Sequence, residues 1–318
     1  MLKYLIVPLG ANAISFCHYP NQSIKDSFTD IDTLHEIVRF SMLENLYIQF
    51  VYPREELPVE INDVVESVDH IKIMPFDYPV KETLDKAQII VFDSWTDLYD
   101  FRLKLDITCV IRTTFKDLLE SGDIMRELLH RLSRLNVVIT DIESVSESQV
   151  IAYKSFLDSL IPLLSELYSQ GNAVQFNLIT DRVILKDMNN CNAAVESITV
   201  SPDGLFYICP GFYSVGMENI GSLTDGIFIK NHYLFDINHA PICKICDAYQ
   251  CKRCVWLNQR VTREVNTPGR IQCLLAHCER NASKNFLENL KSDRTPIVEG
   301  ISIAEIDYLD PLDCIINQ

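Results

Sequence analysis

The sequence predicts an α/β protein whose mostly parallel sheet, open or partly closed into a barrel, is followed by a small cysteine-rich α+β module. Short β-branched apolar runs alternate with helical patterns over the first 180 residues, an order typical of parallel sheets. Eight of the eleven cysteines then fall between residues 191 and 278. We therefore expect an α/β barrel-like domain over 1–184, a metal-binding domain over 185–290 and a C-terminal tail over 291–318.

Seven apolar runs predict the sheet. The candidate strands are Tyr4–Leu9, Leu46–Tyr52, His70–Phe76, Gln88–Asp93, Thr108–Thr113, Val137–Asp141 and Val174–Ile179. The expected helices cover 29–44, 80–86, 95–104, 115–135 and 147–170. The last helix has apolar residues every three or four positions and ends at Gly171, a residue that commonly stops helices. Cys109 lies inside an apolar strand and is expected in the core.

The charge of the chain limits its partners. A net charge of −16 opposes nucleic-acid binding as the main function. The stretch 243–284 is nevertheless basic, with eight Lys or Arg against three Asp or Glu, and contains Tyr249 and Trp256. Nucleic-acid binding by this stretch is kept as a minor alternative. The acidic remainder fits contact with a basic peptide segment.

The cysteines indicate metal binding rather than disulfides. The start, MLKYLIVPLGANA, is similar to an export signal, but its apolar run is six residues long and contains Pro8. A buried first strand is therefore the better interpretation. No apolar run in the sequence approaches the roughly 20 residues that span a bilayer. We expect a cytoplasmic protein, where clustered thiols bind metal more often than they form disulfides.

Two C-x2-C pairs separated by four residues carry the strongest signal. They are formed by Cys243, Cys246, Cys251 and Cys254. A pair with this spacing directs both sulfurs at one metal, so the four thiolates together could make a closed, structural zinc site. That interpretation leaves Cys191, Cys209 and Cys273 less well explained, which favours iron over zinc.

A hairpin is predicted before these pairs. Residues 198–209 read ITVSPDGLFYIC, with a tight-turn signal at Pro202-Asp203-Gly204. Cys209 ends the hairpin and Cys191 precedes it, so the rigid arm can hold both sulfurs toward a common point. Cys273 lies further on, in a helix expected to begin at Thr267-Pro268.

The combined spacing resembles that of SPASM domains, the auxiliary-cluster modules of radical-SAM peptide-modifying enzymes. SPASM domains have a first Cys, a Gly, four residues, a second Cys, then a C-x2-C-x5-C-x3-C run and a last Cys. The matching positions here are Cys191, Gly204, Cys209, the run Cys243–Cys254 and Cys273. The last two gaps of the run are each one residue shorter than in the family.

The wider sequence resembles the CXXX repeat peptide maturases, found beside small cysteine-repeat peptides, in CDAYQCKRCVWLN, HCERN and SFCHY. This resemblance implies a degenerate radical-SAM barrel in the N-terminal region. Radical-SAM cores need C-x3-C-x2-C for the SAM-binding cluster, whereas residues 1–180 contain only Cys17 and Cys109. Cleavage of SAM by this chain alone is therefore not expected, and no catalytic residue is assigned.

The SPASM resemblance also implies one or two four-iron clusters with interleaved thiolate ligands. One set of ligands would be Cys243, Cys246, Cys251 and Cys273. The other would be Cys191, Cys209 and Cys254, with the fourth ligand missing or supplied by His277 or Cys278. The basic residues expected to offset the negative charge are Lys244, Lys252, Arg253, Arg270 and Arg280.

Two functions remain in competition. The first is maturation of a small ribosomally made cysteine-repeat peptide, with iron–sulfur clusters that bind a substrate thiolate or transfer electrons. The second is a non-catalytic scaffold, stapled by zinc or iron–sulfur, that binds the precursor peptide for a separate radical-SAM enzyme.

Overall fold

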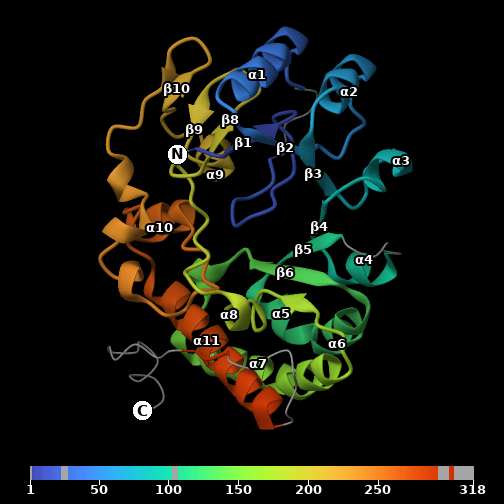
Figure 1. The fold of residues 1–318 in the computed structure, drawn as a ribbon, viewed down its shortest axis with the longest axis vertical. Helices are drawn as coiled ribbons and strands as arrows, with labels where there is room; N and C mark the ends of the chain where they lie inside the picture. The colour runs from blue at the N-terminus through green and yellow to red at the C-terminus, as the bar shows by residue number, and fades with distance from the viewer. Residues whose placement is uncertain (1, 23–27, 102–106, 293–300, 304–318) are drawn as a thin grey trace. The chain divides into compact units, whose positions relative to one another are not determined.

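The computed structural model describes residues 2–22, 28–101, 107–292 and 301–303 (Figure 1). The chain forms two compact units, each built from two stretches. The first unit consists of Met1–Phe92 and Asn192–His239, and the second of Asp93–Cys191 and Ala240–Gln318. The domain boundaries expected at residues 184 and 290 stay predictions. Most of the expected tail, with Cys314, lies outside the described residues.

The first unit is built on a sheet with the strand order β4-β3-β2-β1-β8-β9. Its strands are β1 (Tyr4–Pro8), β2 (Tyr47–Val51), β3 (His70–Pro75), β4 (Ile89–Phe92), β8 (Ser197–Val200) and β9 (Phe206–Tyr207). β1 pairs in parallel with both β2 and β8, and its Leu5 is fully buried. The apolar start of the chain is thus a buried strand, as predicted. It lies between β2 and β8 in the sheet, where parallel strands are covered on both faces.

Among the described residues, the α-helices that accompany this sheet are α1 (Ile31–Leu43), α2 (Val59–Glu66), α3 (Lys81–Leu84) and α9 (Pro210–Ser214). Asp30 caps α1 by accepting hydrogen bonds from the backbone N–H groups of Asp32 and Thr33. α2 was not expected from the sequence. It buries Ile61, Val64 and Val65, whose helical spacing after Pro58 was the signal that could have revealed it.

Strand β3 begins with a partly buried histidine, His70, whose protonation is disfavoured. Burial lowers the pKa of His70, and the nearby Lys72 adds to this, while a hydrogen bond with the Val68 carbonyl at 2.7 Å raises it. The ring also contacts Phe50 edge-on, with the centroids 5.1 Å apart.

We expect acid to destabilise the protein partly through His70. Because its folded-state pKa lies below the unfolded value of about 6.5, the folded state resists protonation, and stability is lost as the pH falls below about 6.5. His70→Gln should reduce the drop in melting temperature between about pH 7.5 and about pH 5.5. The matched variant at exposed His35, His35→Gln, should show the full wild-type drop. Equal drops in wild type and His70→Gln would contradict this.

The predicted hairpin is present in the first unit. β8 and β9 pair antiparallel, with Thr199 opposite Tyr207, and the turn contains Gly204 at φ +79°. Phe206 of β9 packs against Phe40 of α1, with ring centroids 5.0 Å apart. A second short pair, β10 (Gly221–Ser222) and β11 (Gly226–Ile227), follows α9. The sequence signal for the turn was therefore correct.

Gly204→Ala should destabilise the first unit. The left-handed backbone costs a residue with a Cβ about 1–2 kcal/mol, and this Cβ would lie 3.1 Å from Leu223 Cδ1. The melting temperature should fall relative to wild type. Gly122→Ala is the matched control, because Gly122 begins a helix and a Cβ there would make only ordinary contact with Phe156 at 3.9 Å. Equal melting temperatures for the two variants would contradict the expectation.

The second unit contains the parallel strands β5 (Thr108–Thr113), β6 (Arg134–Ile139) and β7 (Gln175–Phe176), in the order β7-β6-β5. Its helices are α4 (Trp95–Asp100), α5 (Phe115–Glu120), α6 (Gly122–Arg131), α7 (Glu147–Ser169), α8 (Asp181–Ile184), α10 (Val255–Thr262) and α11 (Arg270–Ser292). The single helix expected over 115–135 is thus two helices. They meet at Ser121-Gly122, two poor helix formers, where the Ser121 hydroxyl bonds to the Leu118 carbonyl.

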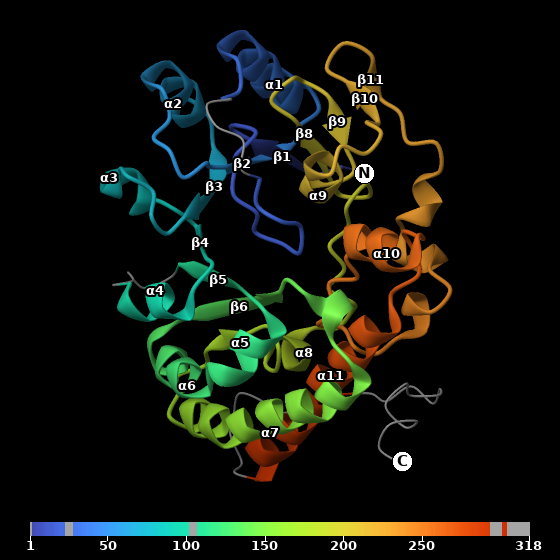
Figure 2. The same cartoon turned by 180° about the vertical axis from the view of Figure 1, so that it is seen from behind.

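Helices α7 and α11 lie side by side in the second unit and run in the same direction (Figure 2). Arg270 at the start of α11 forms an ion pair with Glu147 at the start of α7, at 2.6 Å. Further along, Tyr168 of α7 packs edge-on against Phe286 of α11, with centroids 5.1 Å apart. With this packing, the first turns of α11 lie next to the cysteine-rich segment. Within the described ranges, every helix is too short or too polar to cross a bilayer.

Candidate metal centre

The cysteines between residues 243 and 278 come from two segments of the second unit. The first segment is the chain before α10, where a short 3-10 turn spans Cys243–Ile245, Cys246 follows it, and Cys254 is the N-cap of α10. The second segment is α11, which carries Cys273 one turn from its start. Both stretches were expected to supply ligands, although α11 begins at Arg270, three residues later than predicted. All ten cysteines of the described residues are thiols.

Four of these thiols lie close enough to affect each other's ionisation. Burial raises the pKa of Cys243 to about 11 and that of Cys273 to about 12, and neighbouring Cys246 raises both further. The pKa of Cys251 is likewise raised well above its usual value by burial, and then by Glu279, Cys243 and Cys246. The four residues implied as one ligand set, Cys243, Cys246, Cys251 and Cys273, are therefore neighbours. That they hold a metal stays a prediction.

Backbone N–H groups point at three of the sulfurs. The N–H of Ala248 donates to Cys246 Sγ at 3.5 Å, and the N–H of Arg253 donates to Cys251 Sγ at 3.4 Å. Leu257 makes the same contact with Cys254 Sγ at 3.4 Å, where the cysteine caps α10. Hydrogen bonds of this kind stabilise a thiolate and raise the potential of a bound cluster. For Cys251, the N–H group of Arg253 thus offsets part of the effect of burial, which raises the pKa of the thiol.

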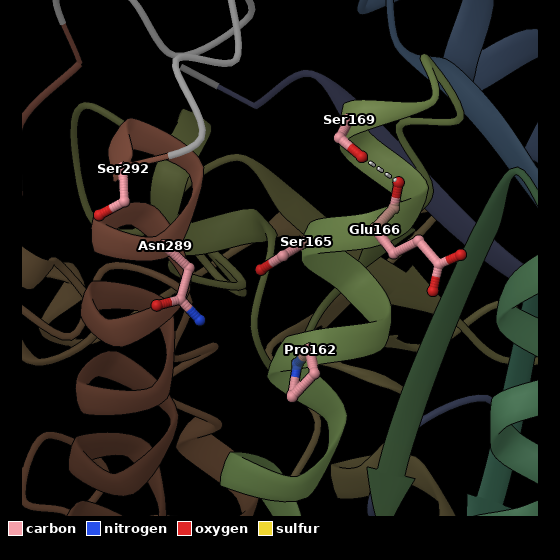
Figure 3. Close-up of a pocket in the computed structure, with 6 residues that line it drawn as sticks. All are labelled: Pro162, Ser165, Glu166, Ser169, Asn289 and Ser292. Atoms are coloured by element: carbon pink, nitrogen blue, oxygen red, sulfur yellow. Dashed lines mark hydrogen bonds between the residues drawn. The ribbon is translucent and has the colours of Figure 1, made fainter.

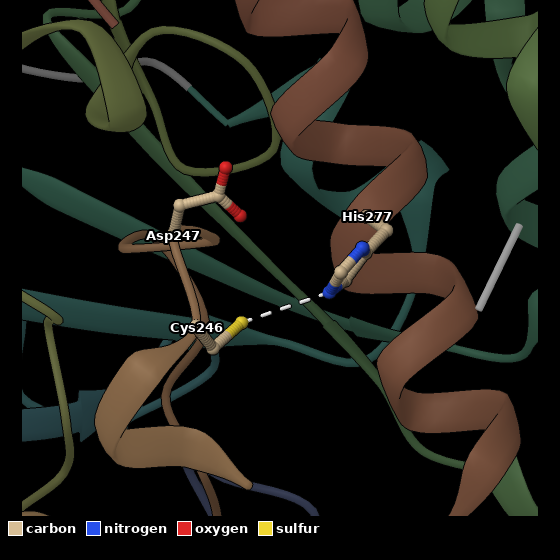
Figure 4. A group of neighbouring side chains, drawn as sticks. All are labelled: Cys246, Asp247 and His277. Carbon is tan, nitrogen blue, oxygen red and sulfur yellow. Dashed lines mark hydrogen bonds between the residues drawn. The ribbon is translucent and has the colours of Figure 1, made fainter. Parts of the chain in front are cut away.

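A histidine and a carboxylate accompany Cys246 (Figure 4). His277 Nε2 lies 3.6 Å from Cys246 Sγ, and the potential ligand atoms of Cys246, Asp247 and His277 all lie within 4.8 Å of one another. The sequence offered His277 as a fourth ligand for the set of Cys191, Cys209 and Cys254. In the structure its ring nitrogen instead faces Cys246, a member of the other set.

Buried arginines surround the same site. Arg280 Nη1 forms an ion pair with Asp247 Oδ1 at 2.8 Å, and both side chains are almost completely buried. Arg182 donates to the Asp247 carbonyl at 2.7 Å, and its guanidinium lies 4.2 Å from the centroid of the Tyr249 ring. Sequence reasoning missed Arg182, because it lies sixty-five positions before Asp247 and only the fold brings the two together.

Glu279 is a second residue that sequence reasoning missed. Burial raises its pKa to about 7, against the effect of hydrogen bonds from Tyr153 and Gln250. Tyr153 Oη donates at 2.8 Å to one oxygen and Gln250 Nε2 at 3.2 Å to the other. An acid with this pKa holds a proton for much of its time near neutral pH. The centre thus contains an acid as well as thiols.

The second implied ligand set is divided between the units. Cys191 and Cys254 belong to the second unit, where the Cys191 N–H donates to the Lys252 carbonyl at 2.9 Å beside the second C-x2-C pair. Cys209 belongs to the first unit and precedes α9 as its N-cap. The site of Cys191, Cys209 and Cys254 stays a prediction. Cys278, the other candidate for its fourth ligand, is 1% exposed on α11.

The two cysteines of the first 180 residues, Cys17 and Cys109, belong to neither predicted ligand set. Cys109 is fully buried in β5, as predicted for a core residue. Cys17 lies in the loop after β1, where Ser15 makes two hydrogen bonds within the loop. The Ser15 N–H donates to Asn21 Oδ1 at 2.7 Å, and the Ser15 hydroxyl donates to the Tyr19 carbonyl at 2.5 Å.

A groove of about 410 Å³ lies between the C-terminal turns of α7 and α11 (Figure 3). Its lining residues are Pro162, Ser165, Glu166, Ser169, Asn289 and Ser292. The Ser169 hydroxyl donates to the Glu166 carbonyl at 2.7 Å. The lining is polar and contains neither cysteine nor histidine, so the groove offers none of the soft ligands that define the metal centre.

Comparison with solved structures identifies the fold. No protein-family model matches the sequence, and no curated protein matches it. The structure of histidine-tagged anSMEcpe with bound AdoMet is similar, with a TM-score of 0.60 and 14% identity over 95% of this chain and 100% of that chain. Native anSMEcpe with bound AdoMet and the Cp18Cys peptide gives 0.59 and 12% over the same shares of the two chains.

This likeness confirms the predicted α/β class with its parallel strands. At identities of 14% and 12%, it is a likeness of fold. Membership of the CXXX repeat peptide maturases stays a prediction.

Proposed function

We propose that this chain takes part in maturing a small ribosomally made peptide, and that its cysteine-rich segment holds an iron–sulfur cluster. One observation supports this most strongly. Two distant chain segments bring Cys243, Cys246, Cys251 and Cys273 together in a fold similar to that of anSMEcpe, which was crystallised with AdoMet and a peptide.

The donor atoms fit such a cluster. Thiolates are the ligands of iron–sulfur clusters, and soft sulfur sets select these clusters or zinc. Four neighbouring thiols supply the ligands, and the N–H groups of Ala248 and Arg253 stabilise two of them as thiolates. When bound, a cluster supplies one-electron transfer or an iron that takes up a thiolate. The role of the protein residues is to hold the sulfurs and to offset their charge.

The substrate class comes from the sequence resemblance to maturases of cysteine-repeat peptides. We propose that Cys191, Cys209 and Cys254 hold a second cluster, whose remaining position accepts a cysteine of the precursor. The Cp18Cys peptide bound to anSMEcpe supports a cysteine-containing peptide as the partner class. The net charge of −16 favours a precursor with a basic segment.

The metal is tested by purifying the protein without oxygen and measuring iron, acid-labile sulfide, zinc and the visible spectrum. We expect iron and sulfide in equal amounts, with at least one four-iron cluster per chain. Stoichiometric zinc without sulfide would rule out the cluster and leave the closed zinc site. Co-expression with a cysteine-repeat precursor, followed by mass spectrometry of the peptide, then tests for modification.

A non-catalytic scaffold is the second candidate function. It is favoured by the loop after β1, which contains one cysteine, Cys17, where a SAM-binding cluster needs three. In this loop Ser15 donates hydrogen bonds to the Asn21 side chain and to the Tyr19 carbonyl. A scaffold would bind the precursor and present it to a separate radical-SAM enzyme. It predicts co-purification of the precursor with this chain, and a mass shift of the peptide only when the partner enzyme is also expressed.

A further inference from the structure

Arg253 stands apart from the other basic residues near the cysteines. It lies between Cys251 and Cys254, and at 1% exposure it is the largest fully buried side chain described. Of the basic residues expected to surround the cluster, three are exposed at the surface: Lys244, Lys252 and Arg270. The buried members of that group are therefore Arg253 and Arg280.

The backbone of Arg253 is bent toward the sulfur of Cys251. Its φ of +43° lies in the left-handed region, which is unfavourable for a residue with a side chain. In this conformation its N–H donates to Cys251 Sγ at 3.4 Å. A glycine would adopt the same backbone conformation with less strain. The backbone conformation therefore does not explain why residue 253 is an arginine, and the contacts of its side chain must explain it.

The side chain of Arg253 reaches the other C-x2-C pair. Its guanidinium lies close enough to the Cys243 sulfur to interact with it electrostatically. One residue thus contacts a sulfur of each pair, Cys251 through the backbone and Cys243 through the side chain.

The two other buried arginines of the site are directed elsewhere. Arg280 forms its ion pair with the Asp247 carboxylate at 2.8 Å, and Arg182 donates to the Asp247 carbonyl at 2.7 Å. Both arginines thus contact Asp247, and Arg182 also contacts the Tyr249 ring. The contacts of Arg253 described above are instead with sulfur atoms.

We propose that Arg253 is the positioning residue and counter-cation of the metal centre. It ties the two C-x2-C pairs together, and its charge offsets the negative charge of the metal–thiolate group. The inference rests on the proposed function, since it assigns a residue to the same centre. Positive charge and hydrogen bonds at the sulfurs raise the reduction potential of a cluster and favour its assembly.

The test uses three variants of the full chain. Arg253→Met removes the charge and keeps the length, and Arg253→Lys keeps the charge without the planar fork. Arg263→Met is the matched control, because Arg263 is an exposed arginine that also has a left-handed backbone, with φ +65°. Each is reconstituted without oxygen, and we measure iron, sulfide and the midpoint potential in a spectroelectrochemical titration. Circular dichroism verifies that each variant is folded.

We expect Arg253→Met to load less cluster than wild type, and the cluster that does load to be reduced at a more negative potential. Arg263→Met should match wild type, and Arg253→Lys should lie between. Full loading of Arg253→Met with an unchanged potential would overturn the inference. If Arg253→Met does not fold, Arg253→Gln takes its place, because it also removes the charge, and full loading with an unchanged potential in that variant would overturn the inference in the same way.

A wild-type protein that takes up zinc and no sulfide would contradict the proposed cluster without deciding the role of Arg253. A zinc site of four thiolates is also anionic. The same variants would then compete for zinc against a chromogenic chelator. Weaker zinc binding in Arg253→Met than in Arg263→Met supports the inference, and equal binding overturns it.

Discussion

Cys251→Ala is expected to remove an entire cluster and not a single iron atom. A four-iron cluster needs its set of thiolates to remain in the protein, so loss of one ligand from Cys243, Cys246, Cys251 and Cys273 lowers the iron content by about four per chain, with a matching loss of sulfide. Cys251 is the sharpest choice, because its sulfur interacts with both Cys243 and Cys246 and accepts the Arg253 N–H.

The control for this prediction is Cys17→Ala. Cys17 lies in the loop after β1 of the first unit, away in sequence from both C-x2-C pairs. Iron, sulfide and the visible spectrum of this variant should equal those of wild type. Cys251→Ala protein with wild-type iron and sulfide would remove Cys251 from the ligand set, and the same loss in both variants would show that the effect is not local.

Arg280→Leu is expected to lower the free energy of unfolding by about 3–5 kcal/mol, because it leaves the Asp247 carboxylate buried without its main cation. The Asp247 side chain is 1% exposed and that of Arg280 is 9% exposed, so water cannot replace the lost ion pair. Denaturant unfolding of the protein as purified measures the effect.

A second variant distinguishes the buried charge from a general packing defect. Replacing both residues, Asp247→Asn with Arg280→Leu, removes the uncompensated charge, and we expect part of the lost stability to return. Arg280→Lys keeps a cation near Asp247 and should cost less than Arg280→Leu. Additive losses in the double variant would show that the pair at 2.8 Å contributes no coupling.

Much of the fold could be predicted because its signals are local. Each of the seven predicted strands corresponds to one of β1–β7, and Gly171, with φ +84°, follows the end of α7 as expected. Apolar runs and helix stops involve neighbouring residues, so one sequence contains them in full. α2 was missed because its eight residues show a short apolar pattern, which is easily passed over between two strong strands.

The candidate site could be predicted only in part. Cysteine spacing identified the ligand candidates Cys243, Cys246, Cys251 and Cys273, since two C-x2-C pairs and a following helix are visible in the sequence. The other residues that contact the site and affect its charge do not occur at such a regular spacing. Arg182, Tyr153 and Glu279 reach it from α8, α7 and α11, and no periodicity relates these positions to one another.

The sequence by itself determined that this protein has an α/β fold with a cysteine-rich segment that can supply thiolates. Apolar period and cysteine spacing are properties of consecutive residues. Tertiary structure alone decided that His277 faces Cys246, that Arg280 is neutralised by Asp247, and that Arg253 turns inward onto the sulfurs. The physical reason is that the packing of α11 against α7 determines which side chains contact the C-x2-C turns. Because these contacts are buried, water does not weaken them.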